Sequence, residues 1–249
     1  MLYTLSLVVI LVAAPIVFIA LYFITAPYGR HFREGWGPSM PARFGWMVME
    51  APALIVMAVT VLSRASSVSP LAFALLALWE IHYGYRTLVF PFLIREQRTR
   101  MPIVLAAMAF LFNCMNGYAN GSWLAGFPQA GEGGVVFVVR VAVGAALFAC
   151  GFVTHVLSDR TLRSLRRNGE GGYQIPHGGL FEYVSSPNYF GEILEWCGWA
   201  IATWSLPGLA FALFTVGNLV PRAHANRRWY KATFPEYPAQ RRRVIPFVY

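Results

Sequence analysis

The chain contains long apolar stretches, and the first of them, residues 2–25, has no charged residue at all. About 20 consecutive apolar residues are enough to cross the hydrocarbon core of a bilayer as a helix. Charged residues make up only 12% of the 249 residues and hydrophobic residues 57%, whereas a soluble domain carries roughly 25% charge. Such a chain cannot cover a water-facing surface. We therefore expect an all-α, polytopic membrane protein, and we exclude a disordered chain or a coiled coil.

Seven stretches are expected to cross the membrane as helices. The uncharged stretch 196–221 is read as a hairpin of two short helices that is interrupted at Pro207. The arginines before and after this stretch are expected on the same, cytoplasmic side, so an even number of crossings must separate them. The expected spans are residues 2–25, 44–63, 70–93, 101–120, 134–157, 189–204 and 206–221.

The arginines also predict the orientation of the chain. Segments 26–43 and 94–100 each carry three arginines, whereas the loops on the opposite side carry only Arg64. By the positive-inside rule the N-terminus faces out and the C-terminus faces the cytoplasm. The sequence shows no internal repeat. One membrane-embedded domain, residues 1–249, is expected, with substrate-side helices at about 1–120 and a cofactor-binding half at about 134–249.

The net charge of +9 indicates an anionic partner beyond the lipid headgroups. Two cytoplasmic segments, 158–187 and 222–249, mix arginine with tyrosine and phenylalanine, and the second also contains a tryptophan. Arginine forks bind phosphates and aromatic rings stack on planar groups, so these segments suit a phosphorylated, aromatic cofactor. The GxGxxG and P-loop patterns are absent, which argues against a Rossmann-type site. No nucleic-acid-binding motif appears either.

Ionisable residues inside predicted spans are candidates for function, because they are costly at membrane depth. Glu50 either pairs with an arginine or histidine of a neighbouring helix, or stays protonated through desolvation and donates a hydrogen bond to a substrate oxygen. Tyr83, in the third span, could donate to the same oxygen. Together the two side chains would form an electrophilic clamp of the oxyanion-hole type.

Other polar residues in or beside the expected spans have two readings each. Asn116 in the fourth span either bonds to a neighbouring helix or contacts a cofactor. Asn188 and Glu192 follow a helix-start signature and either pair with arginines or bind a carboxamide or ribose. The sequence contains no HExxH, CxxC, GxSxG or histidine cluster, so we expect no metal site and no serine nucleophile.

The C-terminal part of the chain, about residues 155–249, closely resembles the steroid 5-alpha-reductase family. The specific motifs are GGLFEYVSSPNYFGEILEW and ATWSLP. The tail with EYP and IPF is shared more loosely with sterol reductases, very-long-chain enoyl reductases and isoprenylcysteine carboxyl methyltransferases. Weaker similarity runs back through HYGYRTLVFPFLIR, WMVMEAP and PYGRHF, so it covers most of the chain. A bacterial homologue is expected.

The resemblance implies a seven-helix membrane oxidoreductase that uses NADPH to reduce a 3-oxo-Δ4 steroid to its 5α-dihydro product. Glu50 and Tyr83 match the catalytic positions that bind the 3-oxo group, with hydride delivered to C5. Met49, also at the substrate site, stands where the family commonly has glutamine. His155 and Asn226 stand where the family has asparagine and histidine. The expected cofactor-binding residues are Asn116, His155, Asp159, Arg166, Tyr173, Asn188, Glu192, Arg222, Asn226 and Tyr230.

Three alternatives stay open at this point. The protein could reduce the double bond of an enoyl or sterol lipid. It could also transfer a methyl group from S-adenosylmethionine, although this cofactor has no 2′-phosphate and would need fewer arginines than the chain provides. It could also be a non-catalytic lipid-binding or scaffold protein. The expected partners are a steroid or sterol-like lipid and the membrane lipids, with no nucleic acid and no obligate protein partner. The expected location is the bacterial inner membrane, or the endoplasmic reticulum in a eukaryote.

Overall fold

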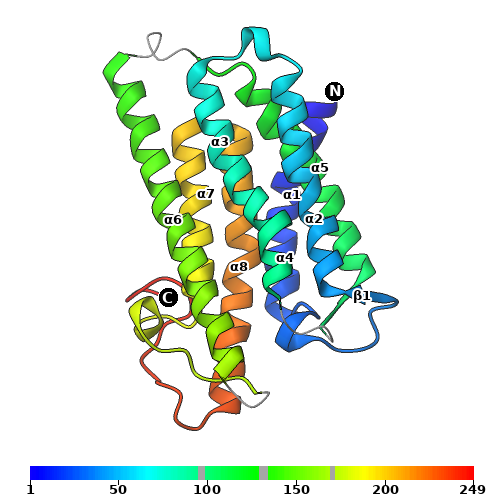
Figure 1. Ribbon diagram of the computed structural model, residues 1–249, viewed down its shortest axis with the longest axis vertical. Coiled ribbons are helices and arrows are strands. Elements are labelled where there is room, and N and C mark those ends of the chain that lie inside the picture. The colour runs from blue at the N-terminus through cyan, green and yellow to red at the C-terminus, as the bar shows by residue number, and fades with distance from the viewer. Residues whose placement is uncertain (95–98, 129–133, 169–171) are drawn as a thin grey trace.

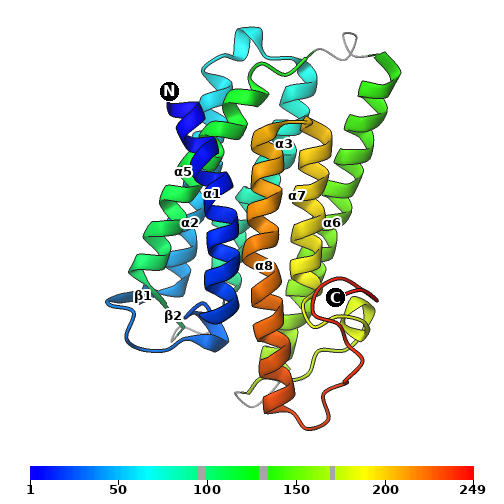
Figure 2. The same ribbon diagram turned by 180° about the vertical axis from the view of Figure 1, so that it is seen from behind.

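The computed structural model describes residues 1–94, 99–128, 134–168 and 172–249, without the side chains of 166–168. Long helices run side by side along one axis (Figures 1 and 2), and the two chain ends lie toward opposite ends of the bundle. The α-helices are α1 Leu2–Phe23, α2 Ala42–Leu62, α3 Pro70–Gly84, α4 Phe90–Leu93, α5 Ile103–Leu124, α6 Gly134–Asn168, α7 Pro187–Thr203 and α8 Leu206–Thr233. The short turns are the 3₁₀-helices η1 Gly29–His31, η2 Ala65–Ser67 and η4 Gly179–Glu182 and the π-helix η3 Tyr85–Val89.

Within the described residues, five helices are long and apolar enough to span a membrane: α1, α2, α5, α8 and Gly134–Leu165 of α6. The mostly helical membrane architecture is thereby confirmed, and the count differs from the expected seven. The expected span 70–93 is divided into α3, η3 and α4, and α7 has only 17 residues. Both still run inside the bundle, with α3 flanked by α2 and α6 (Figure 1).

The expected hairpin between α7 and α8 is present. Trp204 ends α7 in a left-handed conformation with φ of 48°, and the Ser205 hydroxyl accepts a hydrogen bond from the Gly208 amide at 3.0 Å. Pro207 fits in the first turn of α8 because its missing N–H would have no partner there. Helix α8 continues to Thr233, beyond the expected end at residue 221, and α6 continues beyond its expected end at residue 157. In both helices the arginine-rich sequence that follows the apolar part is also helical, so the helix extends past the membrane core.

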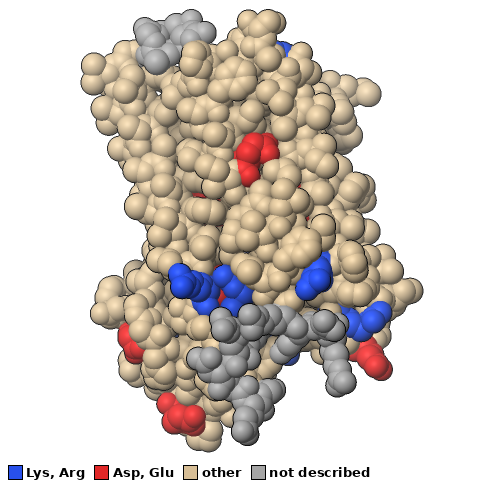
Figure 3. All heavy atoms as spheres, in the orientation of Figure 1, with Lys and Arg blue, Asp and Glu red and all other residues tan. Residues whose placement is uncertain are grey.

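Two short strands join the loops that were expected on the cytoplasmic side, which the sequence did not predict. Strands β1 Ser39–Pro41 and β2 Arg100–Pro102 pair antiparallel, with Met40 opposite Met101. The C-terminal tail folds back at the same end of the bundle, where buried Arg241 donates to the Pro176 carbonyl at 2.7 Å. Most basic side chains visible in Figure 3 gather at this end, below a broad face with few charged side chains.

Helices α6 and α7 touch backbone to backbone along a seam of glycines. A Cβ added to Gly151 would lie 2.4 Å from the Glu195 amide nitrogen, and one added to Gly191 would lie 2.5 Å from that of His155. Small residues allow membrane helices to approach this closely. The seam therefore brings the side chains of His155 and Glu195 into reach of each other in the interior of the bundle.

Candidate active site

The bundle encloses a cavity of about 1460 Å³. Typical pockets for one drug-sized ligand measure about 300–1,000 Å³, so this cavity has room for more than one ligand. Its apolar lining comes mainly from α1, α5 and α8, including Val17, Leu105, Phe112, Phe211 and Phe214. Its charged lining includes Arg30, Glu50, Arg86, Asp159, Arg163, Glu192 and Arg222. A lipid-like part and a polar part thus meet in one space.

Most of the residues predicted for the site line this cavity. They are Met49, Glu50, Tyr83, His155, Asp159, Asn188, Glu192, Arg222, Asn226 and Tyr230. Asn116 and Tyr173 are not among its described lining residues. Asn116 instead accepts a hydrogen bond from Asn120 at 2.9 Å within α5, and it is Asn120 that bonds to another helix, by accepting from Trp199 of α7 at 2.8 Å. The contacts of Asn116 therefore match neither of its two readings. The predicted side chain of Arg166 lies outside the described residues.

Glu50 is held by an ion pair, which is the first of its two readings and not the protonated hydrogen-bond donor of the second. Its Oε1 accepts two hydrogen bonds from Arg86, from Nη2 at 2.8 Å and from Nε at 3.2 Å. Its Oε2 accepts one from Asn113 Nδ2 at 3.3 Å. Two charge-assisted bonds to one oxygen are the arrangement of a carboxylate. The paired reading of Glu50 is therefore the one that the contacts support, and Arg86 is its partner.

Within the described part of the chain, the hydroxyl of Tyr83 is a free hydrogen-bond donor in the lining of the cavity. The side chain is only 3% exposed and packs against the rings of Trp79 and Trp196, at centroid distances of 5.0 Å and 5.7 Å. Tyr83 lines the cavity, and none of the described residues forms a hydrogen bond with its hydroxyl. A buried tyrosine hydroxyl normally finds a partner. The Tyr83 hydroxyl is thus available to a ligand oxygen.

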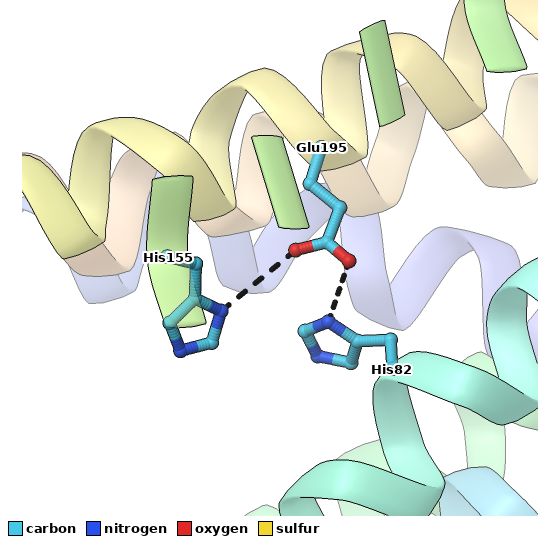
Figure 4. Close-up of side chains that lie close together, drawn as sticks. All are labelled: His82, His155 and Glu195. Atoms are coloured by element: carbon cyan, nitrogen blue, oxygen red, sulfur yellow. Dashed lines mark hydrogen bonds and ion pairs between the residues drawn. The ribbon is translucent and has the colours of Figure 1, made fainter. Parts of the chain in front are cut away.

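A chain of buried polar side chains links α3, α6 and α7, and we call it the polar chain. Its members are His82, Glu195, His155, Asp159 and Asn188 (the first three in Figure 4). The sequence search for a histidine cluster missed it, because His82, His155 and Glu195 come from three different helices. The glycine seam of α6 and α7 is what brings two of them together.

Arginines at the polar end of the cavity lie against aromatic rings. The Arg30 guanidinium lies 4.7–5.1 Å from the ring centres of Tyr173, Trp229 and Tyr230, and its buried Nη1 has no hydrogen-bond partner among the described residues. Arg222 donates to the Tyr189 hydroxyl at 3.0 Å. An unpartnered cationic donor beside aromatic faces fits a phosphorylated, aromatic ligand.

The loop before α2 completes this end and was not predicted as part of the site. His31 Nε2 lies 3.1 Å from Asn226 Oδ1, and burial lowers the pKa of His31. Tyr28 lies under the Arg222 guanidinium at 4.8 Å, and burial raises its pKa to about 12. Both side chains are therefore neutral near pH 7. The only signal in the sequence was the PYGRHF segment that carries them.

Comparison with known proteins agrees with the composition of this cavity. A model of the 3-oxo-5-alpha-steroid 4-dehydrogenase family matches residues 99–249. Steroid 5-alpha-reductase DET2 of Arabidopsis thaliana is 42% identical over 249 residues, which cover 98% of this chain and 95% of that protein. The 3-oxo-5-alpha-steroid 4-dehydrogenase 1 of Rattus norvegicus is 43% identical over 92% of this chain and 89% of its own length.

The human 3-oxo-5-alpha-steroid 4-dehydrogenase 1 is 41% identical over 89% of this chain and 86% of its own length. These relatives come from a plant and from mammals, so they give no support to the expected bacterial source. The likeness extends beyond the matched C-terminal region to nearly the whole sequence, including the helices that carry Glu50 and Tyr83. The chain therefore belongs to the 3-oxo-5-alpha-steroid 4-dehydrogenase family.

Proposed function

We propose that this protein reduces the Δ4 double bond of a 3-oxo-Δ4 steroid with NADPH and forms the 5α-dihydro product. One observation carries the proposal: a single cavity joins Tyr83 and the Glu50–Arg86 pair with the arginines and aromatic rings suited to a phosphorylated cofactor. The names of the relatives point to the same reaction. A scaffold or lipid-binding role would leave these buried polar groups without a purpose.

In this proposal Tyr83 donates a hydrogen bond to the 3-oxo oxygen of the steroid. Negative charge develops on that oxygen as C5 accepts hydride, and a donor fixed in a low-dielectric site stabilises it. Arg86 lies in the same lining and is cationic, while Glu50 holds its guanidinium in place with a 2.8 Å bond. Glu50 and Tyr83 thus remain the catalytic pair, with Glu50 acting through Arg86 in the resting protein. Water supplies the proton for C4.

The polar end of the cavity would hold the cofactor. NADPH, when bound, supplies the hydride. Arg30 and Arg222 would bind its phosphates, and the lining residues Asp159, Asn188, Glu192, Asn226 and Tyr230 would bind its sugars and carboxamide. Arg166, Tyr173 and Asn116 stay predictions for this role. The apolar lining from α1, α5 and α8 is left for the steroid, so the substrate side of the proposed domain includes α8 of the expected cofactor-binding half.

We also propose seven crossings, with the N-terminus outside and the C-terminus cytoplasmic. The chain ends lie at opposite ends of the bundle, which an odd number of crossings requires (Figure 1). Arg100, Arg222 and Arg241 all lie toward the end that holds β1 and the C-terminus.

Single cysteines at 66 and 240, in a variant without Cys114, Cys150 and Cys197, would test this orientation in sealed vesicles with a membrane-impermeant maleimide. Labelling of both from the same side would contradict the orientation.

The reaction is tested by incubating the purified protein with NADPH and testosterone or progesterone, followed by mass spectrometry. The expected product is two mass units heavier than the substrate and is 5α by comparison with standards. It should be lost in Tyr83→Phe, which keeps the ring and removes only the donor, while NADPH still binds.

Two outcomes would contradict the proposal. If the protein bound NADPH but reduced neither steroid, it would still be a candidate reductase, but these steroids would be excluded as its substrates. Absence of NADPH binding, with binding of S-adenosylmethionine instead, would favour the methyltransferase alternative.

A further inference from the structure

The polar chain begins directly beside Tyr83 and ends in the cofactor half of the cavity. His82 Nδ1 lies 2.7 Å from Glu195 Oε1, and Glu195 Oε2 lies 3.8 Å from His155 Nδ1 (Figure 4). On its other side, His155 Nε2 lies 3.4 Å from Asp159 Oδ2. Four side chains from three helices are thus connected through the interior of the bundle.

The far end of the polar chain orients a cavity-lining amide. Asn188 Nδ2 donates to Asp159 Oδ1 at 3.0 Å, and both residues line the cavity. Because its amide nitrogen is engaged by Asp159, the amide oxygen of Asn188 is left to accept a hydrogen bond from a ligand. The polar chain therefore determines which group of Asn188 a bound cofactor meets.

Because the polar chain is buried, its contacts tolerate little displacement of the helices that carry them. Glu195 is 0% exposed, His155 1% and His82 2%, so water cannot replace a lost contact. A buried carboxylate persists only where donors satisfy it. His155 stands between two carboxylates, 3.8 Å from that of Glu195 and 3.4 Å from that of Asp159. Among the described residues neither His155 Nδ1 nor Glu195 Oε2 has a hydrogen-bond partner, so the bond from His82 is the one that holds the Glu195 carboxyl. A shift of α3 against α7 would break the 2.7 Å bond and leave the Glu195 carboxyl without a hydrogen bond from any described residue.

We propose that His82 and Glu195 are positioning residues, which hold the Tyr83 hydroxyl at a set distance from Asp159 and Asn188. The ring of His82 contacts the ring of Tyr83 edge to face, with centroids 4.9 Å apart, so the position of His82 determines that of Tyr83. The inference rests on the proposed function, in which Tyr83 holds the steroid and Asn188 the cofactor. Hydride transfer requires the reacting atoms within about 3–3.5 Å, and a 1 Å displacement can cost on the order of 100-fold in rate.

A divalent metal ion is the competing occupant of this cluster. The ligand atoms of His82, His155 and Glu195 lie within 4.8 Å of one another, which suits such an ion. The contacts favour a direct hydrogen bond between His82 and Glu195 over a metal site. The two bonded atoms lie 2.7 Å apart. Two ligand atoms of a tetrahedral zinc ion with bonds of about 2.0–2.1 Å would lie roughly 3.3 Å apart. Metal content therefore belongs to the test.

The test compares Glu195→Gln, His82→Gln and the double variant with the wild type. In single-turnover reduction of testosterone, each single variant should lose about 10–100-fold in the rate of hydride transfer, while the steroid KM and the NADPH Kd stay within about threefold. The double variant should lose no more than the larger single loss, because both changes alter the same bond between His82 and Glu195. The matched control is Cys197→Ala, on the same helix and packed against the core, which should stay within about twofold.

A second readout keeps this inference separate from the proposed function. If the wild type binds NADPH but reduces no steroid, the proposed function fails, and the emission of the bound nicotinamide still reports its position. Glu195→Gln should shift that emission at an unchanged Kd, whereas Cys197→Ala should not. Where Glu195→Gln does not fold, His82→Gln provides both readouts.

Three results would overturn the inference. The first is an unchanged rate and emission in both single variants. The second is a loss confined to Kd or KM, which would indicate general damage to binding. The third is one metal ion per chain in the purified protein, whose removal by a chelator abolishes activity, since His82 and Glu195 would then be ligands.

Discussion

Removing Arg86 should destabilise the protein strongly, because Glu50 would be left charged and buried. The side chains of Arg86 and Glu50 are 11% and 7% exposed, and their shortest contact is 2.8 Å. Removing one partner of such a buried pair typically costs about 3–5 kcal/mol. In Arg86→Met only the 3.3 Å bond from Asn113 would remain on Glu50. At about 2–4 °C per kcal/mol for a chain of this size, the melting temperature should fall by roughly 6–20 °C.

The double variant Arg86→Met/Glu50→Gln distinguishes a charge effect from lost packing. It removes both charges, so it should recover about 1–3 kcal/mol relative to the sum of the single variants. The assay is thermal unfolding in detergent micelles with and without NADPH. Arg140→Met is the matched control, because Arg140 lies in a membrane helix and its one described hydrogen bond is a 3.5 Å contact to the Ala202 carbonyl. A melting temperature of Arg86→Met within about 2 °C of the wild type, or strict additivity in the double variant, would refute the reasoning.

Three further predictions concern the cavity. Arg222→Ala should weaken NADPH binding by about 1.5–3 kcal/mol, measured by titration, if Arg222 binds a phosphate; an unchanged Kd would place this residue at the lipid headgroups instead. Met49→Gln should raise turnover of a 3-oxo-Δ4 steroid if that is the natural substrate, and a loss would point to another lipid. Burial lowers the pKa of His31 below its ordinary value of 6.5, so the stability due to neutral His31 is present above pH 6.5 and lost as the pH falls toward the lowered pKa. Between pH 7.5 and 5.5 the wild type should therefore lose more thermal stability than His31→Gln, and equal losses would contradict this.

Hydropathy was a good guide to the helices whose residues face lipid. Residues 2–25 and 44–63 closely match α1 and α2, because a lipid-facing helix must be apolar along its length. The expected span 189–204 also matches α7, although this helix carries Glu192, which lines the cavity, and Glu195, which bonds to His82 of α3. The ends of α6 and α8 were placed too early, because polarity marks where the membrane core ends and a helix can continue in water.

The site was harder to predict where it depends on pairings distant in sequence. Glu50 was recognised from its cost in a membrane, yet its partner lies 36 residues away on η3. The polar chain depends on a seam of glycines, whose function is visible only once α6 and α7 are packed together. Arg30 could not be assigned because its three aromatic neighbours come from the far end of the chain. Residue type and membrane depth indicate candidates, and partners require the tertiary structure.

The brevity of α7 has a consequence for how the protein is made. With 17 residues and two glutamates, this helix is a poor candidate to enter the lipid phase by itself during synthesis. The tight turn at Trp204 and Ser205 joins it to the longer α8, so we expect the two to enter together as one hairpin. The carboxyl of Glu195 then meets its histidines only after α3 and α6 are already in place. Completion of the reaction centre is thus the last step of assembly, and a chain truncated before α8 should remain without it.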